Sequence, residues 1–83
     1  METEIGRITH YYNHLNVAAL LLSSDLKLGD MIHILGHVTD FTQKVDSMEI
    51  ERHAVTRGKQ GEEVAIKATQ PVRVNDIVYR ITE

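Results

Sequence analysis

Five histidines in a chain of 83 residues are the first side chains that suggest chemistry. Imidazole binds zinc, copper and nickel, and His33 and His37 have the four-residue spacing that places two ligands on one face of a helix. Gly36 interrupts this segment, which has the pattern of a β-strand, so the spacing guarantees no such arrangement. The chain has no cysteine and no H-E-x-x-H motif. We therefore expect no metal and no other cofactor. The five side chains, which we expect in turns and on an outer face, are His10, His14, His33, His37 and His53.

Nucleophiles and carboxylates give no stronger signal for catalysis. The three serines, Ser23, Ser24 and Ser47, fall in expected turns and lack the G-x-S-x-G context of a nucleophile elbow. Paired catalytic carboxylates require one member in an apolar pocket, whereas Glu62 and Glu63 have the pattern of solvated loop charges. The residues alone therefore predict a protein that is not an enzyme and has no catalytic residue.

Basic and aromatic residues offer a candidate contact surface. Arg52, Arg57 and Lys59 occur in one polar segment, and arginine forks fit phosphate groups. Tyr11 and Tyr12 are consecutive on an expected strand, so one should point inward and the other outward, where it could stack on a base. These five residues are the predicted contacts with RNA or another partner. The alternative is that they are scattered charges that keep an acidic protein soluble.

The elements that would position these side chains are β-strands. Short segments rich in β-branched and aromatic residues alternate with turn residues, and no stretch has the i, i+3, i+4, i+7 pattern of a helix. The expected strands are 5–12, 17–22, 31–35, 41–45, 47–51, 64–68 and 77–81. Because closure removes exposed sheet edges, we predict an all-β fold, a single closed antiparallel β-barrel of six or seven strands.

The predicted domain organisation is a polar N-terminal tail, residues 1–4, and one β-barrel domain, residues 5–83. We expect a loop at 53–61. The expected core follows the period-two pattern and consists of Ile8, Ala18, Leu20, Leu22, Ile32, Ile34, Val45, Met48, Ile50, Val64, Ile66, Ile77, Tyr79 and Ile81. Gly29 and Gly61 each precede an acidic residue and are expected at positive φ, where glycine carries no steric penalty.

Composition restricts the class of protein. Hydrophobic residues make up 42% and charged residues 25%, which is typical of a soluble globular domain. The longest apolar run, residues 17–22, is far shorter than the roughly 20 residues needed to span a bilayer. We expect a cytoplasmic protein without membrane contact. The net charge of −3 argues against a strongly basic nucleic-acid coat.

Six segments carry a likeness to a known family. They are Ile5-Gly6-Arg7-Ile8, the run from Leu26 to Ile34, Lys44-Val45-Asp46-Ser47-Met48, Ala54-Val55, the run from Gly61 to Ile66, and the run from Val74 to Tyr79. Together they resemble the second, β-barrel domain of elongation factor Tu and related translational GTPases. The likeness is greatest to small proteins described as translation elongation factor-like. A related barrel also ends some collagenase-type peptidases.

This resemblance implies a binding module that contacts ribosomal RNA, tRNA or a translation-associated partner. Its motifs are turn signatures. Two positions depart from the family pattern, since Glu62 stands where aspartate is usual and Asn75 stands where glycine is usual. The chain has no G-x-x-x-x-G-K-[ST] loop, so GTP is not expected as a ligand. The alternative function is a protein–protein interaction adaptor unrelated to translation, such as the detached equivalent of an accessory domain in a larger enzyme.

Overall fold

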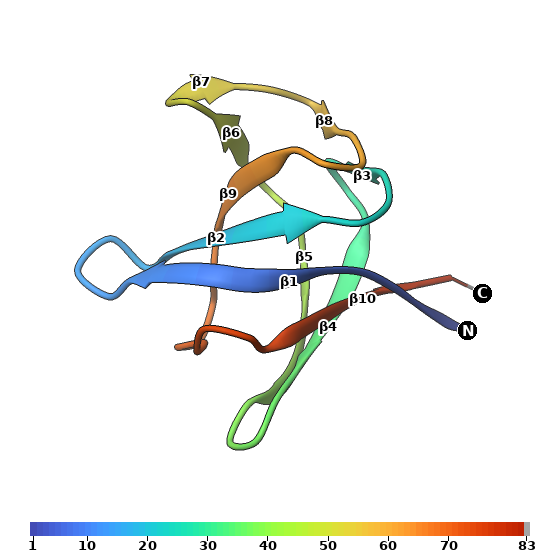
Figure 1. The fold of residues 1–83 in the computed structure, drawn as a ribbon, viewed down its shortest axis with the longest axis vertical. Helices are drawn as coiled ribbons and strands as arrows, with labels where there is room; N and C mark the ends of the chain where they lie inside the picture. Colours follow the sequence, from blue (N-terminus) through green and yellow to red (C-terminus); the bar gives the residue numbers. More distant parts are fainter. Residues whose placement is uncertain (83) are drawn as a thin grey trace.

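The structure is a computed structural model that describes residues 1–82. This part of the chain forms strands and turns without a helix, which confirms the all-β prediction (Figure 1). The strands are β1 (Glu2–Tyr12), β2 (Val17–Leu22), β3 (Leu26–Lys27), β4 (Met31–Leu35), β5 (Asp40–Lys44), β6 (Met48–Ile50), β7 (His53–Ala54), β8 (Arg57–Gly58), β9 (Glu63–Lys67) and β10 (Ile77–Ile81).

Seven of these strands overlap the predicted ranges, three of them with the predicted bounds, and the other three strands were not predicted. β3, β7 and β8 contain two residues each, which is too short to produce a hydrophobic alternation. The expected loop at 53–61 therefore contains β7 and β8. Residues 1–4, expected as a polar tail, contribute Glu2, Thr3 and Glu4 to β1, where they pair with β10.

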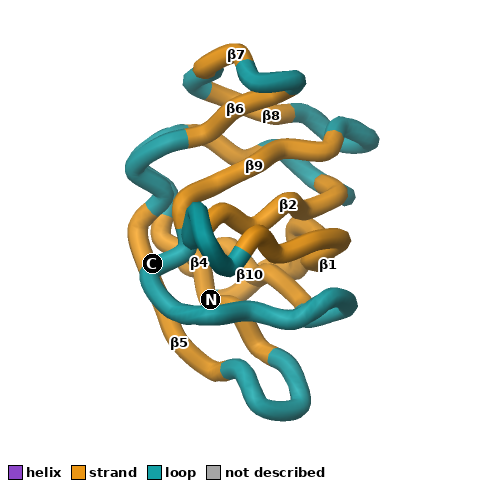
Figure 2. The backbone as a smooth tube through the Cα atoms, turned by 90° about the vertical axis from the view of Figure 1, so that its left-hand side faces the viewer, coloured by secondary structure: helices purple, strands orange, loops and turns teal. Residues whose placement is uncertain are grey.

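Eight strands form one antiparallel sheet in the order β5-β4-β10-β1-β2-β9-β6-β7, and β3 pairs with β8 in a second, small sheet. The large sheet curls around the interior, with β6 and β7 at one end of the molecule and the hairpin of β4 and β5 at the other (Figure 2). In residues 1–82 the end strands β5 and β7 do not pair with each other. The prediction of a closed barrel is therefore wrong, because the sheet stays open between β5 and β7.

The physical reason lies in residues 45–47, which leave the strand geometry between β5 and β6. They carry the chain from the end strand β5 to β6, which is next to the other end strand β7, and here the hydrophobic alternation changes phase. The buried side chain of Gln43 on β5 spans part of the gap. Its Nε2 donates to the Lys67 carbonyl at 2.8 Å, and its Oε1 accepts from the Thr69 N–H at 2.8 Å.

One turn structure occurs three times, at 27–30, 59–62 and 73–76. In each, the N–H of the fourth residue donates to the carbonyl of the first, at 3.0–3.2 Å. The acidic side chain of the fourth residue accepts the N–H of the first, at 2.7–3.0 Å. The third residue has positive φ, which is 93° at Gly29, 89° at Gly61 and 77° at Asn75. The prediction for both glycines is confirmed, and asparagine tolerates the same conformation.

The core contains most of the predicted residues, but β10 was assigned the wrong face. Val78 is fully buried, whereas Ile77, Tyr79 and Ile81 are half-buried on the outer face. Cross-strand pairs of Ile77 with Leu35 and Ile81 with Met31 shield that face, so both faces of β10 are apolar. Ile50 is also only partly buried. The buried hydrophobic residues that the pattern missed are Ile5, Ala19, Leu26, Phe41, Ala68, Val72 and Val78.

Residues 1–82 contain no helix with the length and hydrophobicity to cross a bilayer. The cytoplasmic location stays a prediction.

Candidate functional site

A shallow groove of about 310 Å³ lies on the outer face of β2, β9 and β6, and we call it the outer groove. Its floor is formed by Ala19 and Ala65, which are cross-strand partners on β2 and β9. Glu49 on β6 pairs with Ala65 and stands at the next position in the same row. Two small side chains side by side leave a depression between larger neighbours. The antiparallel register therefore creates the groove.

The wall of the outer groove comes from the hairpin between β1 and β2. Tyr12 is 46% exposed and Leu15 is 61% exposed. The Tyr12 ring lies against His10, with 4.4 Å between the ring centroids. Tyr11 packs against the core instead, and its hydroxyl lies 3.4 Å from Asn16 Oδ1. Tyr12 is thus the outward-pointing tyrosine of the pair.

The rim of the outer groove is mainly acidic. Glu49, Glu51 and Glu63 line it together with Arg52, which gives three negative charges and one positive charge. The Thr9 hydroxyl donates to Glu63 Oε2 at 2.6 Å and orients this carboxylate. An apolar floor and wall beneath an acidic rim suit a ligand that is both apolar and cationic.

The turn that connects β6 to β7 places two of these charges in an unusual backbone conformation. Glu51 and Arg52 have φ values of 50° and 67°, and they form the two-residue connection between Ile50 and His53. Positive φ at both positions matches the twist of a tight hairpin, for which Asn-Gly is the favoured sequence. Glutamate and arginine cost more here, and backbone strain of this kind concentrates at functional sites.

The predicted contact residues do not form one surface. Tyr12 and Arg52 meet at the outer groove. Arg57 lies in a different pocket, and its Nη2 is 3.5 Å from Asp25 Oδ2. Lys59 is exposed at the first position of turn 59–62, where its N–H donates to Glu62 Oε1. A binding role for all five residues stays a prediction.

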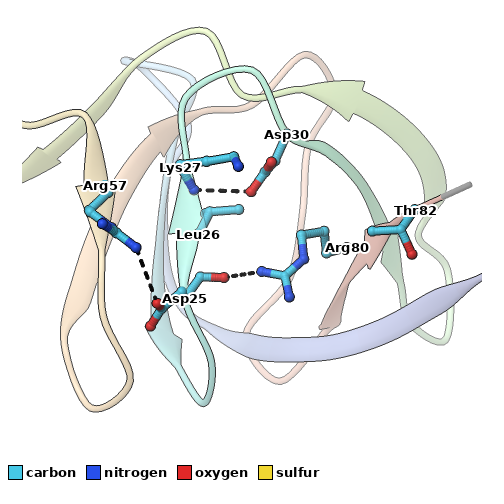
Figure 3. A pocket seen from close by; sticks show the side chains of 7 residues that line it. All are labelled: Asp25, Leu26, Lys27, Asp30, Arg57, Arg80 and Thr82. Atoms are coloured by element: carbon cyan, nitrogen blue, oxygen red, sulfur yellow. Dashed lines mark hydrogen bonds and ion pairs between the residues drawn. The ribbon is translucent and has the colours of Figure 1, made fainter.

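A second pocket, which we call the end pocket, has a volume of about 360 Å³. It is lined by Asp25, Lys27, Asp30, Arg57, Arg80 and Thr82 around Leu26 (Figure 3). The Arg80 guanidinium donates to the backbone carbonyl of Asp25, while Arg57 approaches the carboxylate of the same residue. The contact between Arg80 and Asp25 was not predicted from the sequence, because 55 residues separate them.

His33 on β4 is held between two carboxylates on other strands. Its Nδ1 lies 2.9 Å from Glu2 Oε1 on β1, and its Nε2 lies 2.6 Å from Asp40 Oδ1 on β5. The hydrogen bond to Asp40, followed by that to Glu2, raises the pKa of His33 above its ordinary value of 6.5. In residues 1–82 no cluster of three or more histidine and acidic side chains has the arrangement of a metal site.

This arrangement predicts a pH-dependent stability. Because the folded-state pKa is raised, the contribution of His33 is fully present below pH 6.5 and is lost as pH rises through the folded-state pKa. His33→Gln should therefore flatten the decrease in urea midpoint above pH 6.5. His37→Gln changes an exposed histidine in the turn between β4 and β5 and serves as control. An unchanged pH profile in His33→Gln would show that the two carboxylates do not stabilise the imidazolium.

Comparison with known proteins places this chain beside peptidases. It is 41% identical over 81 residues to an uncharacterized protease of Methanocaldococcus jannaschii, covering 96% of this chain and 20% of the relative. It is 32% identical over 81 residues to a collagenase of Porphyromonas gingivalis, covering 95% of this chain and 22% of the relative. The chain thus spans about a fifth of the curated relatives it matches. No protein-family model matches it.

A solved structure has the same fold. The C-terminal domain of a putative U32 peptidase from Geobacillus thermoleovorans superimposes with a TM-score of 0.88 at 16% identity, covering 94% of this chain and 91% of that one. Its selenomethionine variant gives a TM-score of 0.87 at 16% identity, with 92% and 96% covered. At this identity the likeness concerns the fold alone.

These comparisons correct three predictions from the sequence. The resemblance to the second domain of elongation factor Tu is wrong as a statement of kinship, because the relatives are named a protease and collagenases. The predicted function in translation is contradicted by the same finding, which favours the alternative of a role outside translation. The prediction that the protein is not an enzyme is also contradicted. Over nearly its whole length, the chain is similar to one part of a protease and of collagenases, and it shares the fold of a U32 peptidase C-terminal domain.

Proposed function

We propose that this chain is a polypeptide-binding module of a peptidase and that the outer groove is its docking surface. The relatives support a peptidase setting, since a protease and collagenases contain a similar segment as about a fifth of their length. A peptidase needs surfaces that hold an extended polypeptide.

The single observation that carries the proposal is the combination of side chains in the outer groove. Tyr12 and Leu15 expose apolar surface beside the small residues Ala19 and Ala65. An extended peptide can lay one apolar side chain onto this floor while its neighbours point to the rim. Glu49, Glu51 and Glu63 then attract lysine or arginine side chains of the peptide. The expected ligand is therefore a polypeptide segment that alternates apolar and basic residues.

The strained connection at Glu51 and Arg52 supports the same surface. A tight hairpin would be more stable with Asn-Gly at these positions, by about 1 kcal/mol or more for each strained residue. The two charged side chains stand at the rim of the outer groove in spite of this cost. Their placement is explained if charge at the rim contributes to binding.

The test uses a capped synthetic peptide of alternating lysine and leucine, with both termini blocked, titrated by calorimetry. The double substitution Tyr12→Ser with Leu15→Ser should weaken binding about tenfold, because loss of apolar burial costs roughly 1–2 kcal/mol. The matched control, Val38→Ser with Val74→Ser, removes side chains that are 66% and 55% exposed elsewhere. It should bind as the unsubstituted chain does.

Charge provides the second arm of this test. A peptide with glutamate in place of lysine should bind more weakly, and Glu49→Gln should lower the affinity and the salt dependence for the lysine peptide. If the unsubstituted chain does not bind the lysine peptide, or if the control variant weakens binding equally, the proposed docking surface is wrong.

A further inference from the structure

In the end pocket, two arginines contact the same aspartate. Arg80 on β10 donates from Nη1 to the Asp25 carbonyl, and Nη2 of Arg57 on β8 lies 3.5 Å from an oxygen of the Asp25 carboxylate. Figure 3 shows both guanidinium groups reaching Asp25 from opposite sides, with Leu26 between them. Asp25 therefore limits the freedom of both arginines and reduces the ordering that a ligand would have to impose.

These contacts leave donors on both arginines. A guanidinium has five N–H groups in a planar fork. Within residues 1–82, one nitrogen of each guanidinium group has a polar contact, and in both cases the partner is an oxygen of Asp25. Lys27 adds a third cation, and Thr82 lies at the edge of the pocket. The remaining donors are suited to an acceptor with two coplanar oxygens.

The charge of the end pocket selects among anions. Lys27, Arg57 and Arg80 contribute three positive charges, and Asp25 and Asp30 contribute two negative charges, so the lining sums to +1. This balance matches a single monoanion. A phosphodiester chain brings a row of charges, which would meet both aspartates and a protein whose net charge is −3.

We infer that the end pocket binds a carboxylate, and specifically the C-terminal carboxylate of a polypeptide. The preference for a carboxylate is argued from the geometry of the pocket. The identification of this carboxylate as the C-terminus of a polypeptide rests on the proposed function. A pocket for a free C-terminus would hold the end of a chain that a peptidase receives or releases.

The probe is N-acetyl-alanyl-alanine with a free carboxylate, compared with the same compound as its C-terminal amide. Each is titrated into the isotope-labelled 83-residue chain and followed by NMR. The free acid should shift the signals of Asp25, Lys27 and Arg57 in a saturable manner, and the amide should bind at least about tenfold more weakly, since hydrogen bonds to a charged group are lost.

Two substitutions locate the site. Arg57 is 64% exposed, so Arg57→Gln does not disturb the core, and it should weaken binding of the free acid about tenfold. Arg7→Gln replaces an exposed arginine on the outer face of β1 and should leave binding unchanged. Equal binding of acid and amide, or equal effects of the two substitutions, would overturn the inference. Tighter binding of inorganic phosphate or an oligoribonucleotide would overturn it too.

The two proposals fail separately. If the capped lysine–leucine peptide binds the outer groove while acid and amide bind alike, the carboxylate site is wrong and the docking surface remains supported. If the acid binds the end pocket while the capped peptide does not bind, the carboxylate site is supported and the outer groove as a docking surface is contradicted.

Discussion

Replacing Gln43 by methionine is expected to lower the free energy of unfolding by about 2–3 kcal/mol. The amide of Gln43 donates to the Lys67 carbonyl and accepts the Thr69 N–H, both at 2.8 Å, and the residue is only 6% exposed. Methionine preserves the length of the side chain but removes the amide, so that the Lys67 carbonyl and the Thr69 N–H both lose their hydrogen bond to residue 43. Each bond contributes about 0.5–1.5 kcal/mol, and partly buried groups left without a partner add to the loss. Urea unfolding measures the change.

A local readout accompanies this stability measurement. The Thr69 amide should lose its protection from hydrogen exchange in Gln43→Met, because that N–H then faces a thioether. Thr42→Met on the exposed face of the same strand is the matched control and should change stability by less than about 0.5 kcal/mol. An unchanged midpoint with a protected Thr69 amide would show that Gln43 does not join β5 to the segment after β9.

Replacing Gly36 by alanine is expected to cost about 3 kcal/mol or more. A Cβ at Gly36 would lie 1.9 Å from Asp76 Oδ1 and 2.6 Å from its Cγ. Asp76 cannot easily retreat, because its Oδ2 accepts the Arg73 N–H at 2.8 Å and its carbonyl accepts the Ile8 N–H at 2.8 Å. Relief therefore requires movement of β4 or loss of turn 73–76, which exceeds the usual cost of overpacking.

Gly29→Ala provides the comparison for Gly36→Ala. Gly29 has a φ of 93° and open space around a Cβ, so the substitution should cost only about 1 kcal/mol of backbone strain. The clash at Gly36 can be checked by a double-mutant cycle with Asp76→Ala, which removes the opposing carboxylate. A coupling energy near zero would show that the contact with Asp76 is not the cause.

Local patterning predicted seven of the strands, because most of them alternate apolar and polar residues and β2 is a continuous apolar run. The same pattern failed at β10, where Ile77 and Ile81 pair with Leu35 and Met31 on the outer face. It also failed at the gap in the sheet, since the connection through Gln43 depends on a polar side chain 24 residues away from its acceptor. Pairings between distant segments were not visible in the sequence.

The candidate site was predicted only in part for the same reason. Tyr12 and Arg52 were selected by residue type, and the structure brings them to one groove. The floor of that groove consists of two alanines whose significance depends on the register of β2 with β9. The error about translation has a different cause. The turn residues Gly29, Gly61 and Asn75 describe backbone conformation, and backbone conformation does not identify a ligand.

The central claim is that the outer groove binds a polypeptide that alternates apolar and basic residues. Its most direct test is NMR mapping of the isotope-labelled chain with the capped lysine–leucine peptide. Saturable shifts are expected at Ala19, Ala65 and Glu49, together with the Tyr12 ring. Shifts confined to the exposed apolar residues Leu35, Val38 and Val74, or no shifts at all, would contradict it.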